Sequence, residues 1–256
     1  MTDHVLCDLD QGVLTIRINR IDKKNALTTE MYGVMADAIE RAGTDGAIRV
    51  VLFTGTGGVF TAGNDLVDFL QNPPSGPQSP VYRFINGLLN TDVPIVAAVD
   101  GFAVGIGTTM LLHCEQVFAT ARATFSMPFI NLGILPEAGS SMLLAENCGY
   151  QKAAELLMLG ESFNGREALQ AGIVAHLVEP EELLENALET ARKLAAKPRD
   201  ALRATKRLMR RPKEPLDERV QRENELFLKF LSSPEAREAM AAFLEKRKPD
   251  FKQFQG

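Results

Sequence analysis

The 256-residue sequence contains no tryptophan, only three cysteines and only three histidines, and these shortages exclude several kinds of protein. Cys7, Cys114 and Cys148 are widely separated and form no CxxC pair, which argues against a disulfide framework or a structural zinc site and is typical of a reducing compartment. The histidines form neither an HxH nor an HExxH pattern, so we expect no bound metal. His113 stands among apolar neighbours, and we interpret it as a packed side chain.

Long apolar runs are missing as well. The most apolar stretch, residues 93–112, is interrupted by Asp100 and by three glycines, so it is too broken for a transmembrane helix. No segment has the apolar core of a signal peptide. We therefore expect a cytoplasmic protein without a membrane partner.

Three common catalytic signatures are absent. There is no GxxxxGK[ST], which excludes a P-loop, and no GxSxG, which argues against a serine hydrolase. Two glycine-rich segments, Gly55-Thr56-Gly57-Gly58 and Gly105-Ile106-Gly107, each hold half of a dinucleotide fingerprint, but neither completes G-x-G-x-x-G. A Rossmann domain is therefore disfavoured.

The composition is that of an ordinary globular protein, with 45% hydrophobic and 24% charged residues. Its charge is uneven: residues 1–191 carry 10 Lys and Arg against 23 Asp and Glu, whereas residues 192–256 carry 18 against 10. Two interpretations of the basic end stay open. It forms solvated helix faces, or it meets phosphates of a nucleotide-bearing ligand or of nucleic acid.

Hydrophobic patterning predicts an α/β core followed by helices. Strands are expected at residues 5–9, 13–18, 48–54, 94–99, 116–120 and 173–178, several of them continuously apolar as in a sheet covered on both faces. A helix should begin near Thr28 or Thr29, others should cover residues 65–70, 82–89 and 108–113, and everything after residue 181 reads as helix. The recurring strand, glycine-rich loop and helix favour stacked turns over a doubly wound sheet.

The two glycine-rich loops, residues 55–63 and 101–107, each follow a buried-type strand and precede a helix. Such loops expose backbone N–H groups at a helix N-terminus, where negative charge is favoured. Two loops facing each other would form an oxyanion hole. The alternative, that the glycines only permit tight turns, stays open.

These segments carry a family resemblance. Residues 60–66, FTAGNDL, resemble the F-[SCA]-[AS]-G-x-D-[LI] motif of the crotonase (enoyl-CoA hydratase/isomerase) superfamily. Residues 94–107 and 125–139 resemble its second and third motifs, and residues 19–27 and 243–247 its early and final signatures. The matches occur in the family's order along almost the whole chain.

The resemblance implies an α/β fold of the crotonase (ClpP-like) type. Residues 1–196 would form a spiral of ββα turns, and residues 197–256 a helical region that mediates trimerisation. It also implies an acyl-CoA thioester substrate, no separate cofactor because CoA is part of the substrate, no nucleic-acid partner, and a homotrimer or dimer of trimers.

The resemblance further implies that the backbone N–H groups of Ala62 and Ile106 hold the thioester oxygen, and both lie in the predicted loops. Hydratases of the family carry two glutamates, at the positions occupied here by Thr109 and Phe129. A threonine and a phenylalanine cannot deprotonate water and protonate carbon. The pair of groups that hydration needs is therefore absent.

One carboxylate remains, in Pro136-Glu137-Ala138-Gly139. Several Δ3-Δ2-enoyl-CoA isomerases of the family place their single catalytic glutamate at the position of Glu137; the alternative is an acid that only complements a helix N-terminus. A single carboxylate can take a proton from C2 and return it at C4, and an apolar pocket would raise its pKa. That apolar wall is expected from Phe129, Leu132, Ile134 and Leu135.

Residues 68–82 should line the acyl end. The resemblance implies substrate or CoA contacts for a larger set of residues: Lys23, Lys24, Ala26, Thr61, Gly63, Asn64, Asp65, Leu66, Gly105, Phe129 and Lys246. Two alternatives stay open: the lysines are solvated, and Asp65 caps a helix.

The leading hypothesis from the sequence is a Δ3-Δ2-enoyl-CoA isomerase. The alternatives within the family are an isomerase of ring acyl-CoA epoxides and an enoyl-CoA hydratase. The alternative of another class is a non-catalytic crotonase-fold protein whose basic end binds RNA.

Overall fold

The computed structural model describes residues 3–254. The strands are β1 (Val5–Asp10), β2 (Val13–Ile18), β3 (Val50–Gly55), β4 (Ile95–Val99), β5 (Phe102–Val104), β6 (Gln116–Thr120), β7 (Thr124–Ser126), β8 (Ser162–Asn164) and β9 (His176–Val178). The α-helices are α1 (Thr29–Thr44), α2 (Leu66–Gln71), α3 (Pro80–Asn90), α4 (Ile106–Thr109), α5 (Ser140–Cys148), α6 (Tyr150–Ala154), α7 (Gly165–Gln170), α8 (Leu183–Ala195), α9 (Arg199–Met209), α10 (Leu216–Leu231) and α11 (Pro234–Leu244). Short 3₁₀ or π turns are η1 (Ile21–Lys23), η2 (Met110–His113), η3 (Ile130–Leu132), η4 (Glu155–Leu159) and η5 (Lys252–Phe254).

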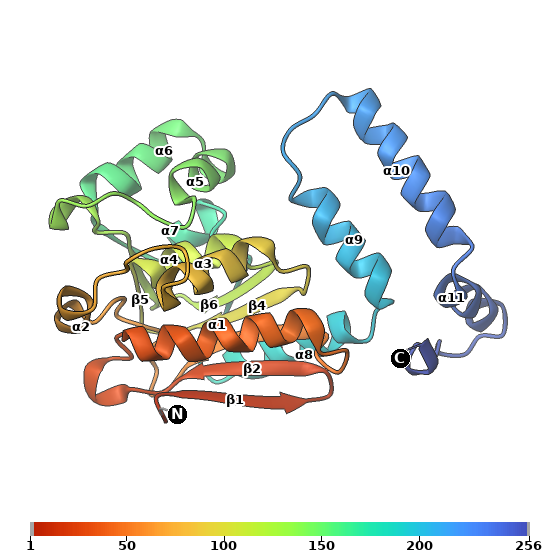
Figure 1. The fold of residues 1–256 in the computed structure, drawn as a ribbon, viewed down its shortest axis with the longest axis horizontal. Helices are drawn as coiled ribbons and strands as arrows, with labels where there is room; N and C mark the ends of the chain where they lie inside the picture. Colours follow the sequence, from red (N-terminus) through yellow and green to blue (C-terminus); the bar gives the residue numbers. More distant parts are fainter. Residues whose placement is uncertain (1–2, 255–256) are drawn as a thin grey trace.

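A six-stranded sheet in the order β1-β2-β3-β4-β6-β9 forms the centre of the core (Figure 1). Only the β1–β2 pair is antiparallel, and the other neighbours are parallel. The strands predicted from the sequence are all present, with ends shifted by a few residues. The predicted α/β fold is therefore confirmed.

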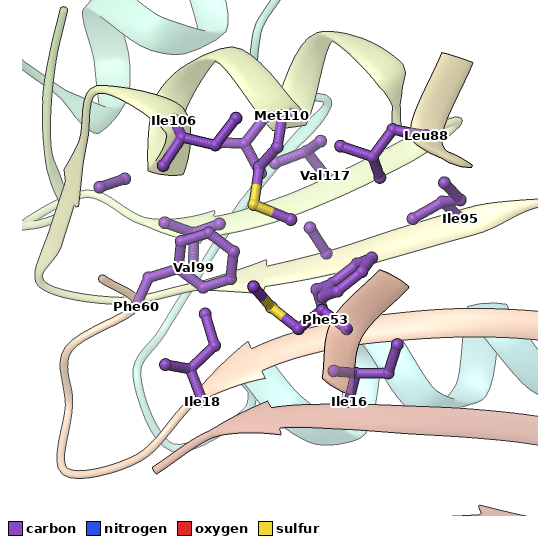
Figure 2. Packing of buried hydrophobic residues seen from close by; sticks show 14 of the residues in the cluster. Ile16, Ile18, Phe53, Phe60, Leu88, Ile95, Val99, Ile106, Met110 and Val117 are labelled. Carbon is purple, nitrogen blue, oxygen red and sulfur yellow. The ribbon is translucent and has the colours of Figure 1, made fainter. Parts of the chain in front are cut away.

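The sheet is covered on both faces, as its continuously apolar strands require. In β3, Val51 and Phe53 belong to the larger core that includes buried residues of α1 and α3, while Val50 and Leu52 pack with α8. Figure 2 shows the larger core, where Phe53 and Phe60 lie between the sheet and the segment carrying Ile106. Burying a side chain of this size contributes roughly 1.5–3 kcal/mol, so this packing fixes where the loops leave the sheet.

A second sheet of three short strands, β5-β7-β8, corrects the predicted loop at residues 101–107. Residues 102–104 of that segment are a strand, paired in parallel with β7. Three-residue strands are too short to leave a periodic signal in the sequence. The glycines predicted to form the loop, Gly101 and Gly105, flank this strand.

The C-terminal helices leave the core gradually. Helix α8 packs on the sheet, and α9 is attached through Lys206, whose buried Nζ donates to Val93 O at 2.7 Å. Helices α10 and α11 project away as an arm, and α10 has no buried residue (Figure 1). No helix among residues 3–254 is long and apolar enough to cross a membrane.

Candidate active site

The two predicted glycine segments lie side by side. Thr61 N donates to Phe102 O at 2.8 Å, and Val104 N donates to Thr61 O at 3.0 Å, so the first loop pairs with β5. Gly63 has φ +85°, and a Cβ there would lie 2.7 Å from Val104 O. Gly105 has φ +57°, a conformation that residues with a Cβ rarely adopt. The glycines therefore allow the two loops to approach each other closely. The sequence of either loop alone does not predict this contact.

The two expected oxyanion donors differ in their surroundings. Ile106 is the first residue of α4, and its N–H has no acceptor within residues 3–254. The Ala62 N–H donates to Lys24 O at 3.0 Å. A thioester oxygen bound between the loops would therefore have to share or replace the bond to Lys24.

An apolar pocket of about 250 Å³ opens between these loops and η3. Phe129, Leu132 and Ile134 belong to its wall, as expected, but Leu135 is 82% exposed and does not. Of the segment 68–82, only Phe69 reaches it. Its lining is Ala62, Gly63, Asn64, Leu66, Phe69, Val104, Gly105, Ile106, Pro128, Phe129, Asn131, Leu132 and Ile134.

A more polar groove of about 580 Å³ adjoins the pocket and shares Ala62, Asn64 and Leu66 with it. It also contains Lys23 and Ala26. A long ligand with one apolar and one charged end could occupy both spaces. The site therefore has the shape of an elongated, two-part cleft.

Several residues expected to bind substrate also have partners within the chain. Asp65 caps α2 and pairs with Arg20 at 2.7 Å, although it also borders the groove. Thr61 is fully buried, and its hydroxyl donates to Asn25 O at 2.7 Å. Lys24 places its Nζ 5.3 Å from the centre of the Phe102 ring.

Lys246 is not brought to the cleft within one chain. It is exposed and follows the end of α11, whereas the cleft lies beside α2 and α4. Figure 1 shows these two regions on opposite sides of the molecule. Any contact between Lys246 and a ligand in the cleft would have to come from another copy of the chain.

Glu137 lies in the loop before α5 and is not part of the pocket lining. The Thr109 hydroxyl, one turn beyond Ile106 in α4, donates to Glu137 Oε1. The other carboxylate oxygen, Oε2, is buried and has no hydrogen-bond partner within residues 3–254. Burial raises the pKa of Glu137 to about 7, against the smaller opposing effect of the Thr109 hydrogen bond. A carboxyl group with that pKa can both accept and donate a proton near neutral pH.

Sequence reasoning missed a polar neighbour of this carboxyl group. Tyr32 of α1 is 2% exposed, and its hydroxyl donates to Oδ1 of Asn64 in the pocket wall. Burial and then the charge of Glu137 raise the pKa of Tyr32. A hydroxyl on the buried face of an amphipathic helix is the signal that could have identified it. The sequence indicated only that Thr109 replaces a hydratase glutamate. Its hydrogen bond to Glu137 was not predicted.

The fold and the cleft define an α/β protein with a two-loop site suited to an anionic oxygen. The enoyl-CoA hydratase/isomerase family model matches residues 8–255. The chain therefore belongs to this family, the crotonases, which confirms the resemblance stated from the motifs and, with it, an acyl-CoA hydratase/isomerase activity.

Named relatives divide between the two reactions. The 2,3-dehydroadipyl-CoA hydratase of Escherichia coli K12 is 34% identical over 94% of this chain and 96% of that protein. Enoyl-CoA delta isomerase 2 of Rattus norvegicus is 36% identical over 81% of this chain and 54% of that longer protein. A solved structure from Magnetospirillum magneticum AMB-1, assigned to the enoyl-CoA hydratases/carnithine racemases, has a TM-score of 0.95, is 46% identical, and covers 98% of this chain and 99% of that one. Similarity alone does not choose between hydration and isomerisation.

Proposed function

We propose that the protein is an acyl-CoA isomerase that moves a Δ3 double bond to Δ2, with Glu137 as its single acid–base group. The observation that carries this proposal is the buried carboxyl group with a free Oε2 and a pKa raised to about 7. It is supported by Thr109 and Phe129, which stand where a hydratase needs carboxylates. Phe129 is also 7% exposed and apolar, which disfavours a bound water at that place.

In the proposed reaction, Glu137 Oε2 takes a proton from C2 of the acyl group. The negative charge moves to the thioester oxygen, where the N–H groups of Ile106 and Ala62 stabilise the dienolate. Each such donor is worth on the order of 10²–10³ in rate. The protonated carboxyl group then returns the proton at C4, so the protein ends in its starting state.

Because Glu137 is not in the present pocket lining, the acyl chain must extend beyond the cavity through a side-chain movement. The CoA nucleotide would occupy the polar groove near Lys23, with Lys246 of another copy supplying a further cation. Phosphates favour such partners. Exposed pairs of this kind contribute little each, so these lysines should affect affinity more than turnover.

A side-by-side assay tests the reaction. With 3-hexenoyl-CoA, the purified protein should form the conjugated 2-enoyl thioester, because one carboxyl group suffices for the proton shift. With 2-hexenoyl-CoA, hydration should be at least about 10²-fold slower than the isomerisation of 3-hexenoyl-CoA. The two hydratase carboxylates, each of which contributes about 10²–10⁴ in rate, are missing. Chromatography of the acyl-CoA products measures both reactions.

Rapid formation of 3-hydroxyhexanoyl-CoA would contradict this proposal and favour the hydratase. Turnover of ring acyl-CoA epoxides but not of 3-hexenoyl-CoA would favour the ring isomerase. The RNA-binding alternative is disfavoured by the pairing of the basic end, where Arg192, Lys206, Arg207, Arg210, Arg219 and Arg222 all lie within ion-pair distance of acidic side chains.

We also propose that residues 197–256 mediate self-association, as a trimer or a pair of trimers. Helix α10 has no buried residue, and a shallow groove along it contains Leu216, Val220 and Leu228, which are 78%, 45% and 66% exposed. Exposed apolar surface of this extent usually marks an interface. A second copy of the chain would cover it and would bring Lys246 to a neighbouring cleft.

Mass measurement by light scattering tests the assembly. The wild-type protein should have three or six times the 28.0 kDa mass of one chain. The double variant Val220→Asp, Leu228→Asp should shift toward one chain mass, because the charges must be desolvated in the interface. The control is Glu223→Gln, a change on the same helix outside the groove. A monomeric wild type, or a variant that keeps the wild-type mass, would contradict the proposed interface.

A further inference from the structure

His113 is a buried polar side chain that the proposed chemistry does not use. It lies at the end of η2 and is 4% exposed. Its Nε2 is 2.7 Å from Ala138 O, the carbonyl next to Glu137 in the chain. Because a carbonyl oxygen can only accept, Nε2 must carry the hydrogen of this bond. The structure thus ties the imidazole directly to the loop that carries the carboxyl group.

That loop holds an unfavourable backbone conformation. Ala138 has φ +53°, in the left-handed region that a residue with a Cβ seldom adopts, and Gly139 follows with φ +70°. Such conformations persist only where neighbouring groups hold them. Two sets of bonds do so here: His113 holds Ala138 O, and the hydroxyl and N–H of Ser140 donate to Glu137 O at 2.7 and 3.0 Å.

His113 is itself fixed from its other end. Its backbone carbonyl accepts a hydrogen bond from Arg210, the residue that follows the end of α9. Arg210 and Lys206 both pair with Glu115, at 3.4 and 3.0 Å. His113 therefore connects the Glu115, Lys206 and Arg210 ion pairs, at the end of α9, to the loop of Glu137.

We propose that His113 is a positioning residue: by holding Ala138 O, it keeps the Glu137 side chain hydrogen-bonded to Thr109, with Oε2 left unpaired for the substrate. This inference rests on the proposed function, because it assigns Glu137 as the acid–base group. Without the imidazole bond, the loop would relax from its left-handed turn, and the carboxyl group would move toward solvent. A displacement of about 1 Å can cost about 10²-fold in rate.

The charged and titratable groups around the two side chains define the expected pH response. Glu115, Lys206 and Arg210 face His113, and burial lowers its pKa, so it stays neutral at pH 7. Tyr32 and Thr109 face Glu137, whose raised pKa comes from burial. A carboxyl group released toward water would regain a lower pKa, nearer its ordinary value.

A matched pair of substitutions tests the role. His113→Gln keeps an amide nitrogen four bonds from Cα, as far as Nε2 is in histidine, whereas His113→Asn ends one bond short and cannot reach Ala138 O. With 3-hexenoyl-CoA, the Gln variant should stay within about threefold of wild-type kcat, and the Asn variant should lose on the order of 10- to 100-fold, with KM nearly unchanged in both. The acid limb of kcat should move to lower pH in the Asn variant only.

Equal kcat in the two variants, whether both are active or both impaired, would overturn the positioning role, as would an acid limb that stays in place in an impaired Asn variant. A wild type that does not isomerise 3-hexenoyl-CoA rejects the proposed function instead. A wild type that is active and is inactivated by Glu137→Gln, combined with an indistinguishable Gln and Asn pair, rejects only the role of His113.

Discussion

Replacement of Glu137 by glutamine should reduce kcat for 3-hexenoyl-CoA by about 10⁴-fold, the upper end of what one acid–base group contributes, because this carboxyl group acts in both proton transfers. The amide has nearly the same shape, and its carbonyl oxygen can still accept the hydrogen bond from Thr109. It can neither remove the C2 proton nor return it at C4. Product binding, measured by calorimetry with 2-hexenoyl-CoA, should be almost unchanged.

The wild-type pH profile should show the same group. Glu137 must be deprotonated to start the reaction, and its pKa is raised to about 7. We therefore expect kcat to be low at acid pH and to increase as the pH rises through about 7. Because the pKa of Glu137 is higher in the folded than in the unfolded protein, the protonated carboxyl group stabilises the fold. This stabilisation is complete at a pH below the unfolded-state pKa and is lost as the pH rises through the folded-state pKa. Glu137→Gln removes that loss, so the variant should melt no lower than the wild type at pH 8.

The matched control is Glu146→Gln, in α5, the helix that follows the Glu137 loop. Glu146 is a partly exposed side chain whose only ion pair among the described residues is with Lys213 at 3.5 Å. Its replacement should leave kcat and the pH profile unchanged. Retention of a substantial part of kcat in Glu137→Gln would remove this residue from the mechanism, and the proposed isomerase would then lack an acid–base group.

The features that could be predicted from sequence are those that local pattern determines. The apolar strand at β3, the Thr28 cap of α1, whose hydroxyl accepts from Met31 N, and the cap formed by Asp65 all follow from neighbouring residues. The resemblance added Glu137, Ala62 and Ile106 as candidate residues. Local pattern could not give contacts between distant segments.

Three such contacts decide the site. Thr109 and Glu137 are 28 positions apart, and nothing local in either segment indicates that the hydroxyl meets the carboxylate. The bond from Ala62 N to Lys24 O depends on a tight turn in which Lys24 has φ +50°. Because this position is a lysine and not a glycine, the sequence does not indicate this conformation. The strand β5 forms because Thr61 and β7 flank it, so its short sequence alone could not identify it.

The substitution Gly63→Ala should reduce kcat by about 10²–10³, the loss expected when one oxyanion donor is displaced. A methyl group at this position would lie 2.7 Å from Val104 O, which is backbone and cannot rotate away. The two loops must therefore separate. Separation moves the Ala62 N–H away from the Ile106 N–H, and the two can no longer converge on one thioester oxygen.

The control must share the backbone strain without the contact, because alanine at a positive φ is unfavourable in itself. Gly172 has φ +69°, and the nearest atom to an added Cβ would be 3.5 Å away, in the side chain of Asn147; neither residue lines the cleft. Gly172→Ala should lose thermal stability through the backbone strain alone and should keep kcat. If Gly63→Ala keeps full kcat, or if both variants lose activity in parallel with their melting temperatures, the paired loops do not form the oxyanion site. A loss of kcat confined to Gly63→Ala, with both proteins folded at the assay temperature, would locate transition-state stabilisation at the junction of the first loop and β5.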